Sequence, residues 1–230
     1  MSIAAVGDIL WSRFRQCVFV HFREQIRTVL QIPIVFVRRL IFIPVIHNLA
    51  DLGSLAESVR AHHVEHHGRG AWEQRERAVE KLWDDIRQAI DVLHLDYRQV
   101  RIYQDGLPLC GKEEQIVREL AGAGSVNHQF VLELMRQGAG LVGTEDPRLL
   151  IREYQLQRRR MAARDAGEEA ASSSPGEEAE VLAARDLFIA QRIAATLQDH
   201  ETGLLFLGAA HRLDELRASG IELQTLNCVG

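Results

Sequence analysis

The sequence predicts an α/β fold: a mostly parallel sheet flanked by helices, with an N-terminal helical or apolar extension. Two observations predict this fold. Short continuous apolar runs recur along the chain, as is typical of strands buried on both faces of a parallel sheet. Segments with the apolar spacing of amphipathic helices separate these runs, and strands that alternate with helices indicate a parallel sheet. The 230 residues are 47% apolar, which is enough for one domain with a substantial core.

Four runs are interpreted as buried strands, and a fifth strand closes the chain. The first is the isoleucine-rich run LIFIPVI at residues 40–46. The other strands are expected at residues 99–103, 139–142, 203–207 and 221–226. Helices are expected from about residue 55, over 72–93, 113–120 and 127–137, after Pro147, over 185–197, and between the last two strands. Asn127 is expected to cap its helix, and Gly138 to end it.

The α/β domain is expected to cover residues 39–230, with residues 1–38 as a separate extension. Within the domain, residues 165–179 read DAGEEAASSSPGEEA and contain no large apolar side chain. Because such a segment buries little apolar surface, nothing offsets the entropy cost of ordering it. We therefore expect a flexible insert there.

The apolar N-terminal region is not expected to span a membrane. The run from Val29 to Ile46 is interrupted by Pro33 and Pro44 and carries Arg38 and Arg39 near its middle. Paired arginines at the centre of a bilayer are costly. We favour a docking helix or a non-native extension, and an amphipathic helix lying on a membrane surface is the alternative.

Composition and charge exclude some partners. The net charge of −5 does not suit a nucleic-acid-binding protein, whose phosphate contacts need a basic surface. The three cysteines are scattered and have no CxxC spacing, so we interpret them as reduced thiols of a cytoplasmic protein. Cys110 is expected to be a small buried thiol, and a nucleophile paired with His47 or His211 is the alternative.

Ionisable side chains follow the four buried strands at His47, Asp105, Glu145 and His211. In open α/β sheets, ligands bind beyond the carboxyl ends of the strands. Two imidazoles with one or two carboxylates suit Zn, Mn, Fe or Co, which can activate a bound water. We expect His47, Glu145 and His211 to bind the metal, with Asp105 as a further ligand or the general base. The structural alternatives are a core-capping histidine, a helix-dipole acid and an Asp-Gly turn.

The C-terminal region carries a family resemblance. A helix containing Arg185 and Asp186 leads to the strand run GLLFLGAAH. This order resembles the TraB/GumN/Tiki group, which is related more distantly to erythromycin esterase-like and ChaN-like proteins. Gly208–His211 matches the group's G-x-x-H motif, and Pro44–His47 matches it with proline in place of glycine. The resemblance covers residues 40–226 in element order and implies that Arg185, the group's helix arginine, steadies an anionic group or orients a carboxylate. Asp186 stands where the group commonly has asparagine.

A second cluster lies at residues 62–67, which read HHVEHH. His62, Glu65 and His66 fit the H-x-x-E-H pattern of inverted zinc proteases. A catalytic zinc site, adventitious metal binding and a solvated polar helix end are the three interpretations, and we favour the last. The chain contains no GxGxxG or Walker phosphate loop and no G-x-S-x-G elbow.

These observations favour a metal-dependent hydrolase that acts on a small molecule or a peptide, although the residues leave open whether the protein is an enzyme. One alternative is a module that holds haem or a metal ion without turnover. The other is a non-catalytic interaction protein whose apolar N-terminal extension mediates self-association into a homo-oligomer or contact with a membrane.

Overall fold

The computed structural model describes residues 38–46, 51, 56–165, 175–212 and 214–226. All described residues belong to one compact unit, Val37–Gly230. His47, the first predicted metal ligand, lies outside the described residues.

The predicted α/β architecture is confirmed: within the described residues, five parallel strands form one sheet. In chain order the strands are β1 (Arg39–Val45), β2 (Val100–Gln104), β3 (Gly140–Val142), β4 (Thr202–Gly208) and β5 (Glu222–Thr225). Their spatial order is β3-β2-β4-β1-β5. Because β4 pairs with both β1 and β2 in parallel, the carboxyl ends of these three strands lie at one edge of the sheet.

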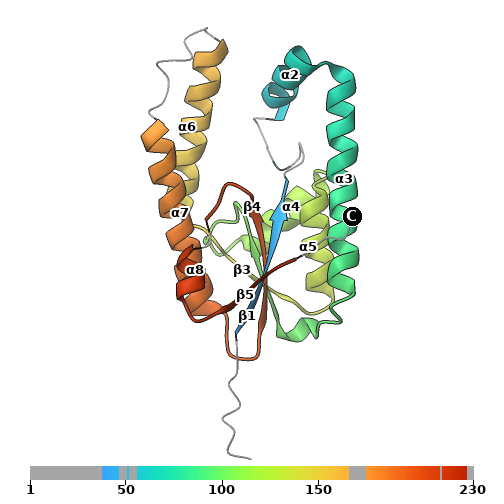
Figure 1. Cartoon of the computed structure of the whole chain (residues 1–230), viewed down its shortest axis with the longest axis vertical. Coiled ribbons are helices and arrows are strands. Elements are labelled where there is room, and N and C mark those ends of the chain that lie inside the picture. Colours follow the sequence, from blue (N-terminus) through green and yellow to red (C-terminus); the bar gives the residue numbers. More distant parts are fainter. Residues whose placement is uncertain (1–37, 47–50, 52–55, 166–174, 213, 227–230) are drawn as a thin grey trace, which may run out of the picture. The chain divides into compact units, whose positions relative to one another are not determined.

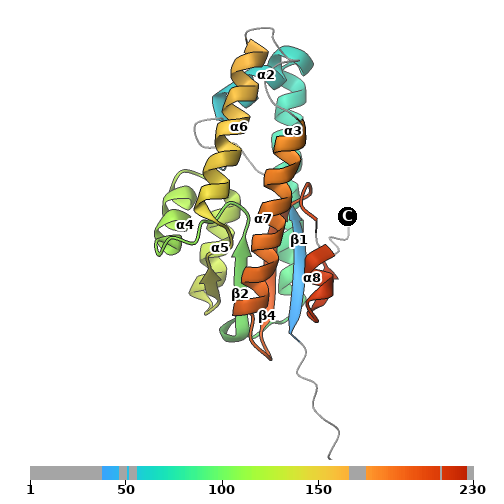
Figure 2. The same cartoon turned by 90° about the vertical axis from the view of Figure 1, so that its left-hand side faces the viewer.

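Seven helices accompany the sheet in the described part of the chain. They are α2 (Ala56–His67), α3 (Arg69–Asp91), α4 (Glu113–Gly122), α5 (Val126–Arg136), α6 (Pro147–Asp165), α7 (Pro175–Thr196) and α8 (Asp214–Ala218). Figure 1 shows α3 and α5 on one side of the sheet, and α7 and α8 on the other. Figure 2 shows α6 and α7 side by side as a helical hairpin. Among the described helices, none is both long and apolar enough to cross a membrane.

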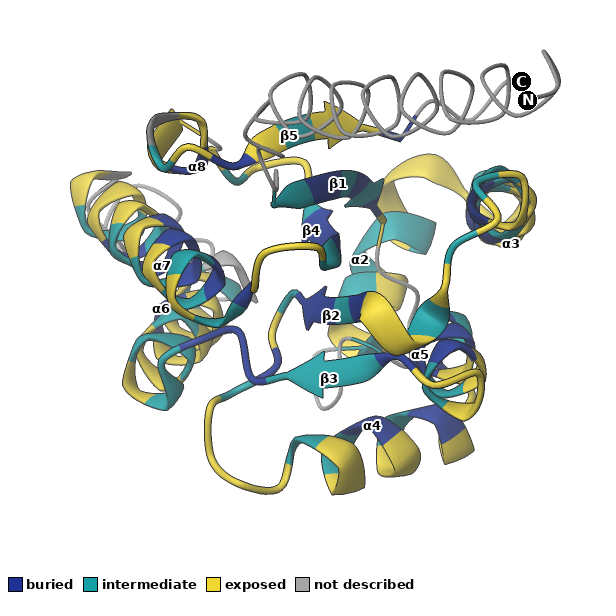
Figure 3. Cartoon of the chain, turned by 90° about the horizontal axis from the view of Figure 1, so that it is seen from below, coloured by how far each residue is buried: buried dark blue, intermediate teal, exposed yellow. Residues whose placement is uncertain are grey.

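Alternating side chains on the strands divide the core into two layers. On the α3 and α5 side, Trp83 stacks on Phe206 with ring centroids 6.2 Å apart, and Phe130 meets the same ring edge-on at 6.1 Å. On the α7 side, Leu205 and Ile193 belong to a second apolar cluster. The central strands are therefore buried on both faces, as their continuous apolar runs predict (Figure 3).

Three sequence-based expectations about helices and strands differ from the structure. The predicted flexible insert at residues 165–179 overlaps two helices. Asp165 ends α6, and α7 begins at Pro175, so residues 175–179 are helical. Residues 166–174 lie outside the described part of the chain. Proline at a first helical position and Glu177 and Glu178 in the first turn favour this early start.

The other two differences concern a strand and a helix cap. Strand β3 is only half-buried, because it lies at the edge of the sheet and has a single neighbouring strand. The cap of α5 is Ser125 instead of Asn127, because the Ser125 hydroxyl accepts a hydrogen bond from the backbone N–H of His128.

Candidate active site at the strand ends

Four predicted site residues meet at the carboxyl edge of the sheet. Asp105 follows β2, Glu145 follows β3, His211 lies three residues beyond β4, and Arg185 projects from α7. The register explains why Asp105 faces α7. The Tyr103 hydroxyl lies 3.0 Å from the Thr196 hydroxyl of α7, and side chains two residues apart on a strand share a face.

Arg185 is the centre of this group. Its Nε and Nη2 donate to the two carboxylate oxygens of Glu145 at 2.6 and 2.5 Å. Nη2 also donates to Asp105 Oδ1 at 2.8 Å, and Nη1 donates to Glu153 Oε2 at 2.6 Å. The planar guanidinium thus binds three carboxylates at once, a geometry that an ammonium group cannot reproduce. The role that the family resemblance implies for Arg185 stays a prediction.

Asp186, the next residue of α7, orients His211. The Nδ1 atom of His211 lies 2.6 Å from Asp186 Oδ1, while Asp186 Oδ2 accepts the backbone N–H of Arg212 at 3.0 Å. The opposite ring nitrogen, Nε2, lies 3.6 Å from Asp105 Oδ1. The Asp186 carboxylate therefore fixes the ring through Nδ1, and the Asp105 carboxylate faces Nε2.

The glycine of the G-x-x-H run has a structural explanation. The backbone N–H of Gly208 donates to Asp105 Oδ2 at 2.9 Å, and a Cβ on residue 208 would lie only 3.0 Å from that oxygen. The backbone N–H of His211 then donates to the Gly208 carbonyl at 3.2 Å, which closes the turn. Glycine at this position lets Asp105 approach the strand end that carries His211.

Burial and neighbouring charges shift the pKa values of Glu145 and His211 in this cluster. Burial raises the pKa of Glu145, and the Arg185 guanidinium only partly offsets this effect. Burial by itself lowers the pKa of His211, but the carboxylates of Asp105 and Asp186 outweigh this effect and raise that pKa to about 9. At neutral pH the imidazole is thus positively charged and faces Asp105.

The geometry does not suit Glu145 as a metal ligand. Its side chain is fully buried, and Arg185 occupies both of its oxygens. His211 Nε2 and the Asp105 carboxylate remain as potential metal ligands, but no third described residue joins them. In the described ranges, only His62, Glu65 and His66 place three ligand atoms within 4.8 Å of one another. The predicted set of His47, Glu145 and His211 stays a prediction, because His47 lies outside those ranges.

Sequence reasoning misses two members of the cluster. The sequence singles out Asp186 only as a departure from the family pattern, although a charged Arg-Asp pair within an apolar helical run is a signal that could identify it. Nothing in the sequence distinguishes Glu153 from the other charged residues of α6.

Cys110 is exposed instead of buried, so the expectation of a small buried thiol is wrong. Its loop faces solvent, where the backbone N–H of Cys110 donates to Glu113 Oε1 at 2.7 Å.

Comparisons with protein-family models, curated proteins and solved structures found no match. The resemblance to the TraB/GumN/Tiki group therefore stays a prediction that depends on the residues quoted above.

Proposed function

We propose that the protein is a hydrolase whose active site is the charged cluster at the carboxyl ends of β2 and β4. The observation that carries this proposal is the Asp186–His211 pair, whose 2.6 Å hydrogen bond fixes the imidazole beside a second carboxylate, Asp105. A histidine oriented by one carboxylate is a recurring arrangement for proton transfer in enzymes. Its position at a strand end is where open α/β sheets bind their ligands.

His211 and Asp105 have complementary roles in the proposed reaction. His211 enters as the general acid, because its raised pKa keeps Nε2 protonated at neutral pH. Asp105, 3.6 Å from that nitrogen, is the general base that takes a proton from the attacking water. Water then attacks the ester, amide or phosphoester centre, and His211 protonates the leaving group. Asp105 gains one proton and His211 loses one, so the number of protons on the two residues together does not change during the reaction.

Arg185 and Glu145 are positioning residues in this proposal. The Arg185 side chain is only 5% exposed and its donors already bind three carboxylates, so it has little capacity to bind a substrate anion. Its Nη2 hydrogen bond to Oδ1 holds the Asp105 carboxylate facing His211 Nε2. Glu145 in turn accepts the backbone N–H of Gly106 at 2.8 Å, which ties the loop after β2 to the guanidinium.

We assign no step of the reaction to a metal ion, because Arg185 occupies both oxygens of Glu145 and no third described ligand joins His211 and Asp105. The proposed substrate is a small molecule or a peptide. A reducing compartment such as the cytoplasm is proposed on the basis of the scattered cysteines and the free thiol of Cys110.

An activity screen tests the proposal. Tag-free protein would be incubated with p-nitrophenyl acetate, p-nitrophenyl phosphate and a fluorogenic peptide amide. We expect turnover of at least one substrate, and we expect His211→Gln to lower kcat/KM by roughly 10²- to 10⁴-fold, the usual contribution of a general acid or base. His94→Asn is the matched control, since His94 is exposed and has a positive φ of 47° that asparagine tolerates.

Two results would overturn the proposal. One is a folded His211→Gln protein that turns over substrate as fast as the wild type. The other is the absence of hydrolysis of all three substrate classes by wild-type protein whose circular dichroism shows a folded α/β domain. Either result would leave the cluster as a structural clamp between α7 and the sheet.

A further inference from the structure

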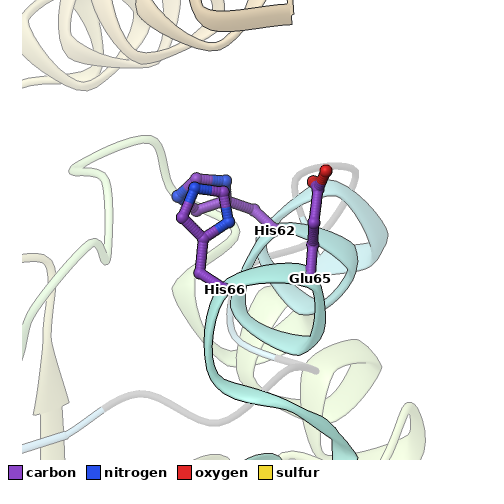
Figure 4. Close-up of side chains that lie close together, drawn as sticks. All are labelled: His62, Glu65 and His66. Carbon is purple, nitrogen blue, oxygen red and sulfur yellow. The ribbon is translucent and has the colours of Figure 1, made fainter.

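We propose that helix α2 carries a surface binding site for a divalent transition-metal ion, formed by His62, Glu65 and His66. One ligand atom from each residue lies within 4.8 Å of the other two. The His62 and His66 ring centroids are 4.1 Å apart. Figure 4 shows these two rings side by side, with the Glu65 carboxylate on the adjacent flank of the helix. This site is independent of the proposed hydrolytic centre.

The donor set matches the coordination chemistry of zinc and its neighbours. Two imidazole nitrogens and one carboxylate oxygen are common zinc ligands, and a water would fill a fourth tetrahedral position. Ligand atoms around a tetrahedral zinc lie roughly 3.4 Å apart, given metal–ligand distances of about 2.1 Å. The three atoms therefore need to move inward by about 1 Å, which rotamer changes can supply because Glu65 and His66 are exposed and His62 is half-buried.

The position of the cluster on the helix favours a cation. Residues four apart lie one above the other on a helix, which places His62 and His66 on one face. The cluster occupies the C-terminal half of α2, and His66 belongs to its last turn. The partial negative charge at a helix C-terminus attracts cations, so it adds to the attraction of the Glu65 carboxylate.

Core packing does not explain these histidines. Helix α2 has 12 residues, and none of its described side chains is buried. Its packing is with α3, for example between His63 and Trp72, and a helix of this length is marginally stable in water without tertiary packing. A metal ion that bridges His62 and His66 would cross-link successive turns. Metal binding should therefore increase the helicity of α2.

The adjacent pair His63 and His67 supplies a matched control. These residues have the same four-residue spacing on the same helix, and their ring centroids are 4.8 Å apart. His63 instead packs edge-on against Trp72 of α3 at 5.2 Å, and its Nδ1 is buried. Replacement of this pair removes as many imidazoles as replacement of His62 and His66, but it leaves the proposed ligands in place.

The experiment is a titration of tag-free, chelator-treated full-length protein with ZnCl₂. Isothermal titration calorimetry measures the binding, and hydrogen exchange of residues 56–67 measures the stability of α2. We expect one zinc per chain in the wild type and in His63→Gln/His67→Gln, with slower exchange of α2 when zinc is bound. His62→Gln/His66→Gln should weaken zinc binding at least 10- to 100-fold, the loss seen when even an outer-shell partner is removed, and should abolish the change in exchange. Glu65→Gln should weaken binding with less effect on the helix.

Three outcomes would overturn this proposal: no saturable binding to the wild type, equal affinity in His62→Gln/His66→Gln, or an equal loss of affinity in both double variants. The last result would indicate non-specific chelation by a histidine-rich segment. None of these outcomes bears on hydrolysis, so the two proposals fail separately.

Discussion

Gly208 and Asp105 are in direct contact across the neighbouring strands β4 and β2: the backbone N–H of Gly208 donates to Asp105 Oδ2 at 2.9 Å. This contact joins the turn that carries His211 to the carboxylate that faces the His211 ring. It links the glycine and the histidine of the G-x-x-H run through a residue that lies 103 positions before Gly208 in the chain.

Replacement of Gly208 by alanine should therefore disturb the cluster. The new Cβ would lie 3.0 Å from Asp105 Oδ2, so the carboxylate or the turn must shift. We expect a loss of about 1–3 kcal/mol in the free energy of unfolding, as for other overpacked positions, measured by urea denaturation. Gly122→Ala is the control, because a Cβ at this last residue of α4 meets no atom within 4 Å. Equal stability of both variants and the wild type would contradict the close contact.

Replacement of Arg185 by methionine should strongly destabilise the domain. Glu145 is fully buried, and without the guanidinium its charge would lose its main partner. Breaking such a buried pair typically costs about 3–5 kcal/mol, which urea denaturation would reveal. The additional change Glu145→Gln should recover part of this loss, since it removes the unpaired charge.

The exposed pair of Arg118 and Glu114 provides the comparison for Arg185. These residues are four apart on α4, and their side chains are 65% and 56% exposed. Arg118→Met should therefore change the free energy of unfolding very little. A loss in Arg185→Met no larger than in Arg118→Met would show that the buried cluster does not hold α7 to the sheet.

Stability should fall as the pH rises through the titration of His211. Its pKa in the folded protein, about 9, lies above its ordinary value of 6.5, so folding favours the protonated ring. The resulting stabilisation is complete below pH 6.5 and is lost as the pH rises through 9. Urea denaturation between about pH 6 and 10 should show this decrease in wild type and a smaller decrease in His211→Gln. An NMR titration midpoint of His211 near or below 6.5 would contradict the prediction.

Removal of metal ions should leave hydrolysis unchanged, because the proposed acid and base are His211 and Asp105. Chelator-treated protein would be assayed and its metal content measured by elemental analysis. Activity lost on chelation and restored by Zn, Mn, Fe or Co would instead support the predicted metal centre, and His47→Ala would then test its first ligand. A strong visible absorption band in the purified protein would support the haem alternative.

The alternation of apolar runs and helical segments is sufficient to predict the five parallel strands and most of the helices. Local chemistry decides these elements: continuous apolar runs suit strands with two covered faces, and Gly138 ends α5 with a positive φ of 116°. The start of α7 is earlier than the sequence predicts. The stretch after Pro175 lacks large apolar residues up to Val181, although its proline and acids favour a helix start.

The sequence by itself determined which residues reach the carboxyl edge of the sheet, because strands that run in parallel bring their carboxyl ends together. On that basis Asp105, Glu145 and His211 are expected to be neighbours, and the structure places them around Arg185. Only the tertiary structure decided which side chains pair. Arg185 occupies both oxygens of Glu145, 40 positions away, and Asp186 holds His211, 25 positions away. These pairs depend on how α7 is rotated and seated against the sheet, which long-range packing sets and local sequence patterns do not encode.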